Sequence, residues 1–174
     1  LSENGSRMRL AERITVRQRD ASAPPPDGES ARFDVLFADV PCSGLGVLAK
    51  KKEIKYRIGQ ADFDALETLQ RKILTASLPM VKEGGVLLYS TCTVHERENG
   101  AMLDWLTERF PLRAEPLFPY LPERFVKAAL ADAAKVDPAL SEKMRADMEN
   151  GRLQLLPGVH ACDGFFLARL RKLF

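Results

Sequence analysis

The segment FDVLFADVPCSGLG, residues 33–46, is an apolar run that ends in a proline, a cysteine and two glycines. A nearly continuous apolar run of this kind is typical of a strand buried on both faces of a parallel sheet. GGVLLYSTC, residues 84–92, has the same character and also ends in a cysteine. Between the two, residues 62–82 place apolar side chains at helical spacing, with Asp62 as the expected N-cap and Pro79 ending or kinking the last turn. Strand, helix and strand in this order predict an α/β fold with both strands parallel in one sheet.

Downstream of these strands the pattern continues less regularly. A helix is predicted over 96–109 and a weaker strand over 112–118. The Ala-, Lys- and Glu-rich stretch 120–150 is typical of helix, and Asp137-Pro138 should interrupt it. DGFFLARL, residues 163–170, is predicted to be a final strand, whose direction the pattern leaves open.

The residues before the first apolar run are more polar. Residues 1–12 contain helix formers and are interpreted as the remnant of a helix, and ITVRQRD at 14–20 alternates like a short strand. Residues 21–32 carry three consecutive prolines and are predicted to form a flexible loop. The chain begins with Leu rather than Met, inside a helical-looking stretch, which suggests a piece of a longer protein.

The composition limits the classes of protein to which this chain can belong. The 174 residues, of which 45% are hydrophobic and 29% charged, can build a sizeable core, which excludes disorder of the whole chain. The 26 basic and 24 acidic side chains nearly cancel, so any affinity for nucleic acid must come from local clusters. No apolar run reaches the ~18 residues that a membrane helix needs, and no signal peptide is recognisable. We therefore expect a cytoplasmic protein without a membrane partner.

Cysteines mark the carboxyl ends of both predicted strands. Cys42 follows Asp39 and Pro41, and Cys92 follows the second strand, so parallel neighbours would carry both thiols on one rim beside a carboxylate. Cys42, Cys92 and Cys162 lack the close pairing of zinc sites or disulfide frameworks, so no metal is expected. Two paired catalytic thiols, two buried structural cysteines and a reversible disulfide remain open, the last disfavoured in a reducing compartment.

Two motifs resemble a known family. DVPCSGLG at 39–46 and YSTCT at 89–93 resemble the proline-cysteine and threonine-cysteine motifs of the Sun (Nol/Nop/Fmu) RNA cytosine-5 methyltransferases, above all the bacterial members that act on 16S ribosomal RNA. The DNA cytosine methyltransferases have a proline-cysteine motif without the threonine-cysteine partner. The resemblance extends over residues 1–174 and includes three further matches, which are Glu98-Asn99, IKYR at 54–57, and LPG followed by DGFF near the end.

The resemblance implies a Rossmann-like domain that depends on S-adenosylmethionine. It implies that the Cys92 thiolate attacks carbon 6 of a cytosine, and that Cys42 assists the elimination that releases the product. Asp39 would hydrogen-bond the amino and ring-nitrogen edge of the base. The cofactor-binding positions implied in the same way are Asp20, which would contact the adenine amino group, Asp39 and Pro41.

The most basic part of the chain directly follows the PCSGLG turn. KKKEIKYR at 50–57 carries five positive charges and one negative charge. Basic side chains beside the rim would contact RNA phosphates, although a solvated surface loop explains them nearly as well. The predicted RNA-binding residues are Lys50, Lys51, Lys52, Lys55 and Arg57.

One part of the family pattern has no counterpart in this chain. The resemblance implies an upstream glycine-rich loop and an acidic residue that hold the cofactor, and neither occurs here. Residues 1–174 are therefore expected to be the carboxyl-terminal part of the catalytic domain, without its first two strands or any N-terminal RNA-binding domain. The strand edge left without a partner would allow self-association.

Two other classes of function remain possible from the residues. An RNA-binding or ribosome-assembly module would keep the fold without catalysis, but such a module has no need of both cysteines and Asp39. A thiol oxidoreductase is expected to hold its cysteines closer in sequence, often two residues apart. The modified cytosine and the oligomeric state are not predicted.

Overall fold

The computed structural model describes residues 2–174, and the side chains of Ser2 and Arg57 lie outside the description. Five strands form one sheet in the order β1-β2-β5-β3, and β4 pairs with β5. β1 and β2 are parallel, as predicted, whereas β5 runs antiparallel to β2, β3 and β4. The strands are β1 (Phe33–Asp39), β2 (Val81–Thr91), β3 (Leu112–Ala114), β4 (Arg152–Leu155) and β5 (Phe165–Lys172).

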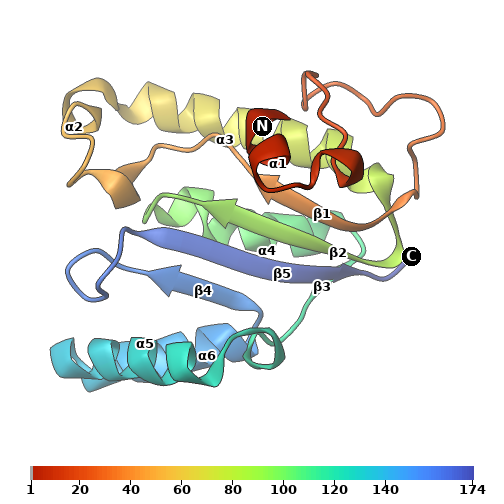
Figure 1. The fold of residues 1–174 in the computed structure, drawn as a ribbon. Coiled ribbons are helices and arrows are strands. Elements are labelled where there is room, and N and C mark those ends of the chain that lie inside the picture. The colour runs from red at the N-terminus through yellow and green to blue at the C-terminus, as the bar shows by residue number, and fades with distance from the viewer. Residues whose placement is uncertain (1) are drawn as a thin grey trace.

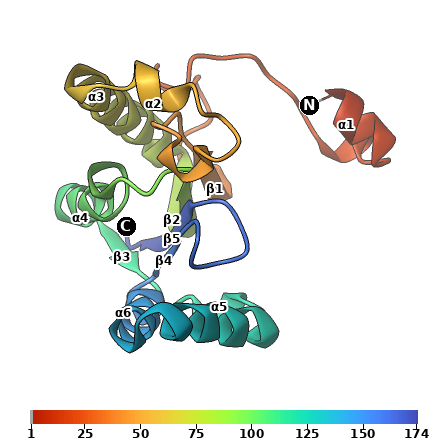
Figure 2. The same ribbon diagram turned by 90° about the vertical axis from the view of Figure 1, so that its left-hand side faces the viewer.

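Helices pack on one face of the sheet and beyond one of its edges. The helices are α1 (Ser2–Arg7), α2 (Ile54–Arg57), α3 (Gln60–Ser77), α4 (Gly100–Arg109), α5 (Glu123–Val136) and α6 (Pro138–Glu149). Figure 1 shows α3 crossing from β1 to β2, and Figure 2, viewed along the strands, places α3 and α4 on the same side. The helical pair α5–α6 lies beyond β4, and α1 stands away from the sheet (Figure 2). The arrangement is the α/β fold that the two apolar strands predict.

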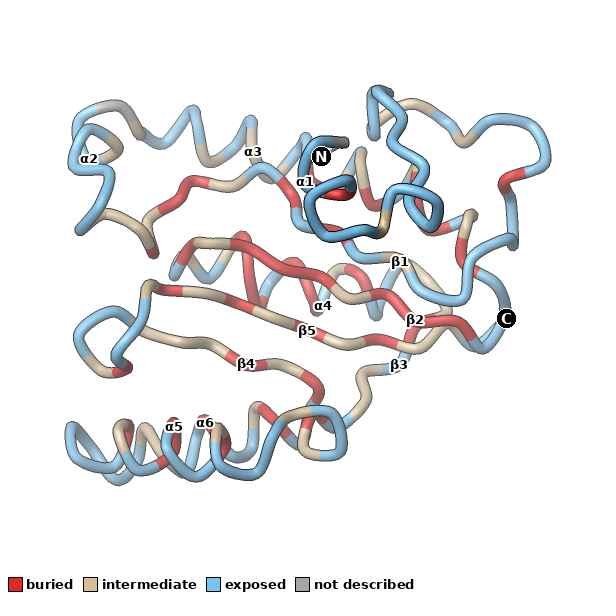
Figure 3. The backbone as a smooth tube through the Cα atoms, in the orientation of Figure 1, coloured by how far each residue is buried: buried red, intermediate tan, exposed pale blue. Residues whose placement is uncertain are grey.

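The main core lies between the sheet and the helices α3 and α4. Its buried side chains include Leu74 of α3, Leu87 and Tyr89 of β2, and Leu106 of α4. Figure 3 shows buried residues concentrated along β2. This strand lies between β1 and β5, and its residues from Gly85 onward are almost all buried.

β1 is buried on one face only, so the prediction of burial on both faces is wrong. Ala38 points into the core, whereas Val35 and Phe37 are 54% and 60% exposed. The reason is the period of two along a strand: alternate side chains face the helix layer of α3 and α4, and the others face the side of the sheet that these helices do not cover. Self-association through this edge stays a prediction.

Several boundaries also differ from the predictions. Residues 14–20 are not a strand, because the described residues offer them no partner strand, and Arg17 and Arg19 pair with Glu29 instead. α3 begins at Gln60 rather than at Asp62. Asp62 lies inside the first turn, where its carboxylate accepts a hydrogen bond from the Gly59 N–H at 2.8 Å.

The second and third predicted strands are also displaced. β2 begins at Val81, three residues before the predicted start at Gly84, and its register with β1 shifts between Phe33 and Val35, next to Gly84 with a φ of 71°. β3 ends at Ala114 rather than at 118, and β4 lies in a segment without a predicted strand.

The stretch 120–150 is a helical hairpin with a core of its own. As predicted, Asp137-Pro138 separates two helices, and the Asp137 carboxylate caps α6 by accepting the Ala139 N–H at 2.9 Å. A second cluster of buried residues packs α5 and α6 against β4; it comprises Leu117, Val126, Ala129, Leu130, Ala133, Met144, Met148 and Leu153. Within residues 2–174, no helix is both long and apolar enough to span a membrane.

Candidate active site

The parallel pairing of β1 and β2 brings the two cysteine loops together. Asp39, at the end of β1, lies opposite Ser90 near the end of β2. The chain leaves both strands at the same edge of the sheet, and the Sγ atoms of Cys42 and Cys92 lie 3.4 Å apart. Both are free thiols and partly exposed. Two residues 50 positions apart therefore form one thiol pair at the sheet rim, as the strand ends predicted.

The Cys42 thiol is shifted toward its protonated form. Burial raises the pKa of Cys42 to about 12, and a hydrogen bond with Cys92 contributes in the same direction. A thiol with this pKa keeps its proton at neutral pH and can donate it toward the Cys92 sulfur.

The raised pKa predicts slow alkylation of Cys42. An ordinary thiol has a pKa of about 8.5, and the lower thiolate fraction of Cys42 outweighs its higher intrinsic nucleophilicity. At pH 8 we expect iodoacetamide to label Cys42 roughly 100-fold more slowly than an ordinary thiol, with the rate rising steadily above pH 9. Peptide mass spectrometry at several pH values measures the rate, with urea-unfolded protein as the control. Labelling of folded Cys42 at the unfolded rate would contradict the assignment.

Asp39 is the last residue of β1, three positions before Cys42. Its Oδ1 accepts a hydrogen bond from the Ser90 Oγ–H at 2.9 Å, which orients the carboxylate. The residue is exposed on the uncovered face of β1, so it is accessible to a ligand. Pro41, the second residue after β1, accepts a hydrogen bond from Gln70 Nε2 at 2.9 Å through its carbonyl oxygen, which fixes the chain just before Cys42.

Glycines allow three loops to meet at the rim. The Gly46 N–H donates to the Cys92 carbonyl at 3.0 Å, and the Gly164 N–H donates to the Gly46 carbonyl at 2.8 Å. A Cβ at Gly46 would lie only 2.3 Å from the Gly164 oxygen. Gly44 takes a φ of 69°, which favours glycine. The glycines of the PCSGLG turn therefore serve close backbone packing between the loops that carry Cys42 and Cys92.

The buried carboxylate of Glu98 is hydrogen-bonded to the Cys42 loop and is linked to the Cys92 loop through Ser43. Glu98 is fully buried, and its Oε1 accepts the Ser43 N–H at 2.8 Å and Gln70 Nε2 at 3.0 Å. Its Oε2 accepts the Ser43 hydroxyl. Ser43 Oγ lies 2.7 Å from Thr93 Oγ1, so the residue after each cysteine belongs to one hydrogen-bonded network.

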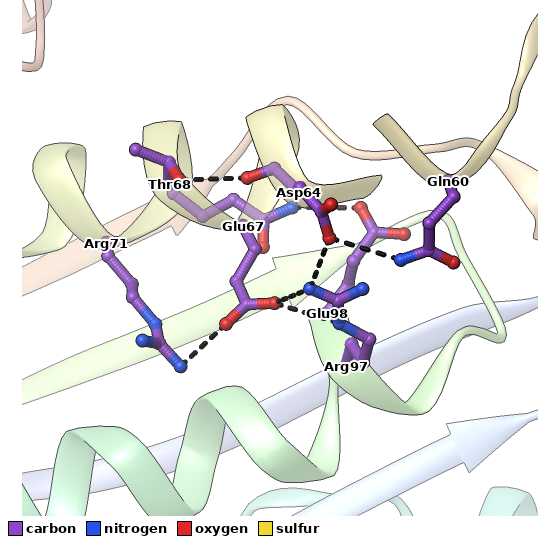
Figure 4. Close-up of polar contacts among 8 residues, drawn as sticks. Gln60, Asp64, Glu67, Thr68, Arg71, Arg97 and Glu98 are labelled. Atoms are coloured by element: carbon purple, nitrogen blue, oxygen red, sulfur yellow. Dashed lines mark hydrogen bonds and ion pairs between the residues drawn. The ribbon is translucent and has the colours of Figure 1, made fainter. Parts of the chain in front are cut away.

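Ion pairs fasten this region to α3. Arg97 lies next to Glu98, and its guanidinium contacts Asp64 at 2.8 Å and Glu67 at 2.5 Å (Figure 4). Glu67 also pairs with Arg71 at 2.7 Å, one helical turn further along α3. The crossover helix and the 3-10 turn at Glu96–Glu98 are thereby held together by charged groups outside the core.

The predicted RNA-binding residues lie in an exposed segment after the Cys42 loop. Lys51, Lys52 and Lys55 are exposed. Lys50 pairs with Asp163 at 2.6 Å, so part of its charge is neutralised. The side chain of Arg57 lies outside the described residues.

Asp20 is placed differently from the prediction. Instead of ending a strand, it lies in a turn where its carboxylate accepts hydrogen bonds from the Ser22 N–H at 2.9 Å and the Ser22 hydroxyl at 2.8 Å. The hydrogen bonds from Ser22 lower the pKa of this carboxyl. None of these contacts links Asp20 to the thiol pair.

The network around Glu98 contains polar residues that the sequence analysis did not assign to the site. They are Ser43, Gln70, Thr93 and Asn99, together with Glu98 itself. One signal was available, since Ser43 and Thr93 each follow a cysteine directly. Gln70 gave none, because a glutamine in a helix is ordinary.

Comparisons with known proteins agree with this geometry. The sequence profile described as "16S rRNA methyltransferase RsmB/F" matches residues 1–171. The chain is 34% identical over 159 residues to "Probable ribosomal RNA small subunit methyltransferase B" of Bacillus subtilis, covering 91% of this chain and 32% of that protein. It is 33% identical over 141 residues to "Ribosomal RNA small subunit methyltransferase F" of Klebsiella pneumoniae, covering 80% and 26%. The chain thus spans about a third or less of these relatives.

Solved structures share the fold. A methyltransferase homologue from Pyrococcus horikoshii superposes with a TM-score of 0.55 at 26% identity, covering 82% of this chain and 40% of that one. NSun6 from the same organism, solved with SFG, gives a TM-score of 0.65 at 24% identity over 97% of this chain and 39% of that one. The Rossmann-like methyltransferase fold implied by the sequence resemblance is confirmed. With its two motifs paired at one rim and its profile matched almost end to end, the chain belongs to the 16S rRNA methyltransferase RsmB/F family.

Proposed function

We propose that the full-length protein transfers a methyl group from S-adenosylmethionine to carbon 5 of a cytosine in ribosomal RNA, in the small-subunit 16S RNA. Family membership supports methylation of ribosomal RNA. The observation that carries the finer proposal is the 3.4 Å contact between Cys42 Sγ and Cys92 Sγ at the carboxyl ends of parallel neighbours. Two thiols at one rim suit a reaction in which one forms a covalent bond and the other helps to break it.

Carbon 5 of cytosine is a poor nucleophile until the ring is activated. In the proposed reaction, the Cys92 thiolate adds to carbon 6, and the electron pair of the 5,6 double bond becomes available at carbon 5. S-adenosylmethionine, when bound, supplies the electrophilic methyl group that carbon 5 takes up. Water then takes the proton from carbon 5, the C–H electron pair restores the 5,6 double bond, and the bond between carbon 6 and the Cys92 sulfur breaks to release a thiolate. The proposal assigns Cys42 to this elimination, because its protonated thiol, 3.4 Å from the Cys92 sulfur, can donate a hydrogen bond to the departing thiolate.

Asp39 is proposed to hold the base. Its carboxylate is oriented by Ser90 and exposed at the end of β1, so it can accept hydrogen bonds from the amino group and the protonated ring nitrogen of the adduct. Asp39, with its exposed carboxylate, and the backbone of Pro41 are also proposed to contact the cofactor. Asp20, held by Ser22 in its own turn, is proposed as a cofactor contact on the resemblance alone.

The exposed lysines after the Cys42 loop are proposed to bind RNA phosphates. Lys51, Lys52 and Lys55 follow the loop that carries a reacting thiol, so a strand of RNA entering the rim would pass them. Lys50 is included with its Asp163 partner, which RNA would have to displace. Arg57 is included from the sequence pattern.

The test is a methyl-transfer assay on the full-length protein. The protein is incubated with methyl-labelled S-adenosylmethionine and 16S RNA that lacks the modification, and nuclease digests are analysed for 5-methylcytidine. We expect label in 5-methylcytidine at one or a few positions, and no label in an equal amount of DNA of the same sequence. RNA binding without any transferred label would instead favour a catalytically inactive RNA-binding or ribosome-assembly module.

A further inference from the structure

The dipeptide Glu98-Asn99 connects to both cysteine loops through separate sets of hydrogen bonds. Glu98 ends the 3-10 turn Glu96–Glu98 that follows the Cys92 loop, and Asn99 directly precedes α4. Glu98 is 0% and Asn99 1% exposed. The Tyr89 hydroxyl donates to the Glu98 carbonyl at 2.6 Å, which anchors the backbone of the dipeptide to β2. Both side chains are therefore held where they can position other groups.

Glu98 acts on the loop of Cys42. Its carboxylate accepts the backbone N–H and the hydroxyl of Ser43, the residue bonded directly to Cys42. Gln70 donates both to this carboxylate, at 3.0 Å, and to the carbonyl of Pro41, at 2.9 Å. The residues on both sides of Cys42 are thereby fixed by one buried acceptor and its helix partner.

Asn99 acts on the loop of Cys92. Its Oδ1 accepts the Thr91 hydroxyl at 2.7 Å, and its Nδ2 donates to the Thr93 carbonyl at 3.1 Å and to Gln154 at 2.7 Å. Thr91 and Thr93 flank Cys92 directly. The asparagine therefore holds both neighbours of the proposed nucleophile.

We propose that Glu98 and Asn99 are positioning residues with separate tasks: Glu98 places Cys42 for elimination, and Asn99 places Cys92 for attack. This inference rests on the proposed function. Neither side chain contacts a thiol, so each acts through the residues that flank its cysteine. A displacement of about 1 Å at a reacting group costs on the order of 100-fold in rate, so loss of either set of hydrogen bonds should show in the step that its cysteine serves.

The two tasks predict opposite effects on the covalent protein–RNA adduct. Glu98→Ala should slow elimination after attack, so the adduct should accumulate to at least about 10 times the wild-type level while product formation falls. Asn99→Ala should slow attack, so adduct and product should fall together, by about 100-fold. Full-length variants are incubated with 16S RNA and S-adenosylmethionine, and adduct is measured by denaturing electrophoresis and product by methyl transfer.

Conservative variants distinguish a loss of positioning from a loss of folding as the cause of reduced activity. Glu98→Gln keeps an acceptor for the Ser43 N–H and a polar group toward its hydroxyl, so it should restore most of the product formation lost in Glu98→Ala. Thr91→Val removes the hydroxyl that Asn99 accepts, and Ser43→Ala removes the hydroxyl that Glu98 accepts together with its contact to Thr93 Oγ1, both with little change in volume. Ser43→Ala should raise the adduct level as Glu98→Ala does, and Thr91→Val should lower it as Asn99→Ala does, each to a smaller extent. These two variants test the separate roles if an alanine variant does not fold.

The outcomes distinguish this inference from the proposed function. Cys42→Ala and Cys92→Ala are assayed in parallel as references. If Cys42→Ala forms no adduct, the proposed mechanism itself fails. If Cys42→Ala accumulates adduct while Glu98→Ala and Asn99→Ala change the adduct level in the same direction, separate positioning is overturned. The same holds if Ser43→Ala and Thr91→Val change the adduct level in the same direction.

Discussion

Cys92→Ala in the full-length protein is expected to lose both methyl transfer and the covalent RNA adduct, whereas Cys42→Ala is expected to accumulate the adduct. Without the Cys92 thiolate no bond to carbon 6 forms, so turnover should fall by at least about 1000-fold. Without Cys42, attack and methyl transfer remain possible but elimination is impaired. Denaturing electrophoresis of protein incubated with labelled RNA measures the adduct, and methyl transfer measures turnover.

The double variant provides the control for this pair. If the complex seen in Cys42→Ala is bonded through Cys92, it must vanish when both cysteines are replaced. Cys162→Ala, in an exposed residue outside the thiol pair, should leave adduct and turnover unchanged. Adduct in Cys92→Ala and none in Cys42→Ala would reverse the two assignments and indicate the arrangement of the DNA enzymes.

Gly46→Ala is expected to reduce turnover by about 100-fold, although the change adds one methyl group. A Cβ there would lie 2.3 Å from the Gly164 oxygen and 2.8 Å from the Cys92 oxygen. Both are backbone atoms of the loops that meet at the rim, so the contact cannot be relieved by rotating a side chain. The loops must separate, which displaces Cys92 from Cys42. Steady-state methyl transfer measures the loss.

Gly59→Ala is the matched control for this variant. The nearest atom to a Cβ at Gly59 is Asp62 Oδ2 at 3.8 Å, and its φ of −123° is open to any residue. We expect it to retain wild-type turnover and thermal stability. Full activity in Gly46→Ala would show that the thiol pair does not depend on the close approach of these loops.

The sequence predicted the pairing of the thiols because that pairing follows from topology. Two apolar runs joined by a crossover helix become parallel neighbours, and parallel neighbours end at the same edge. To predict the contact between Cys42 and Cys92, it was therefore enough to place the ends of the two strands correctly. The polar network could not be predicted in this way, since Glu98 reaches Ser43 across 55 positions and depends on how α3 packs.

Other predictions failed where burial depends on spatial neighbours. The sequence of an apolar strand does not show how many of its faces are covered, and β1 exposes Phe37 because α3 and α4 pack on the other face of the sheet. The alternation at 14–20 resembles a strand, but a strand also needs a partner backbone. By contrast, the break at Asp137-Pro138 was predictable because proline lacks the N–H that a continuing helix requires.

The α5–α6 hairpin has a buried cluster that is separate from the main core. Leu130 and Met148 pack within the hairpin cluster, whereas Leu74 and Leu106 belong to the core beneath the thiol pair. Elements with their own buried cluster can open without unfolding the rest of a domain. A local opening of the hairpin therefore leaves the packing of Leu74 and Leu106 intact. Substitutions between α5 and α6 are accordingly expected to have little effect on catalysis.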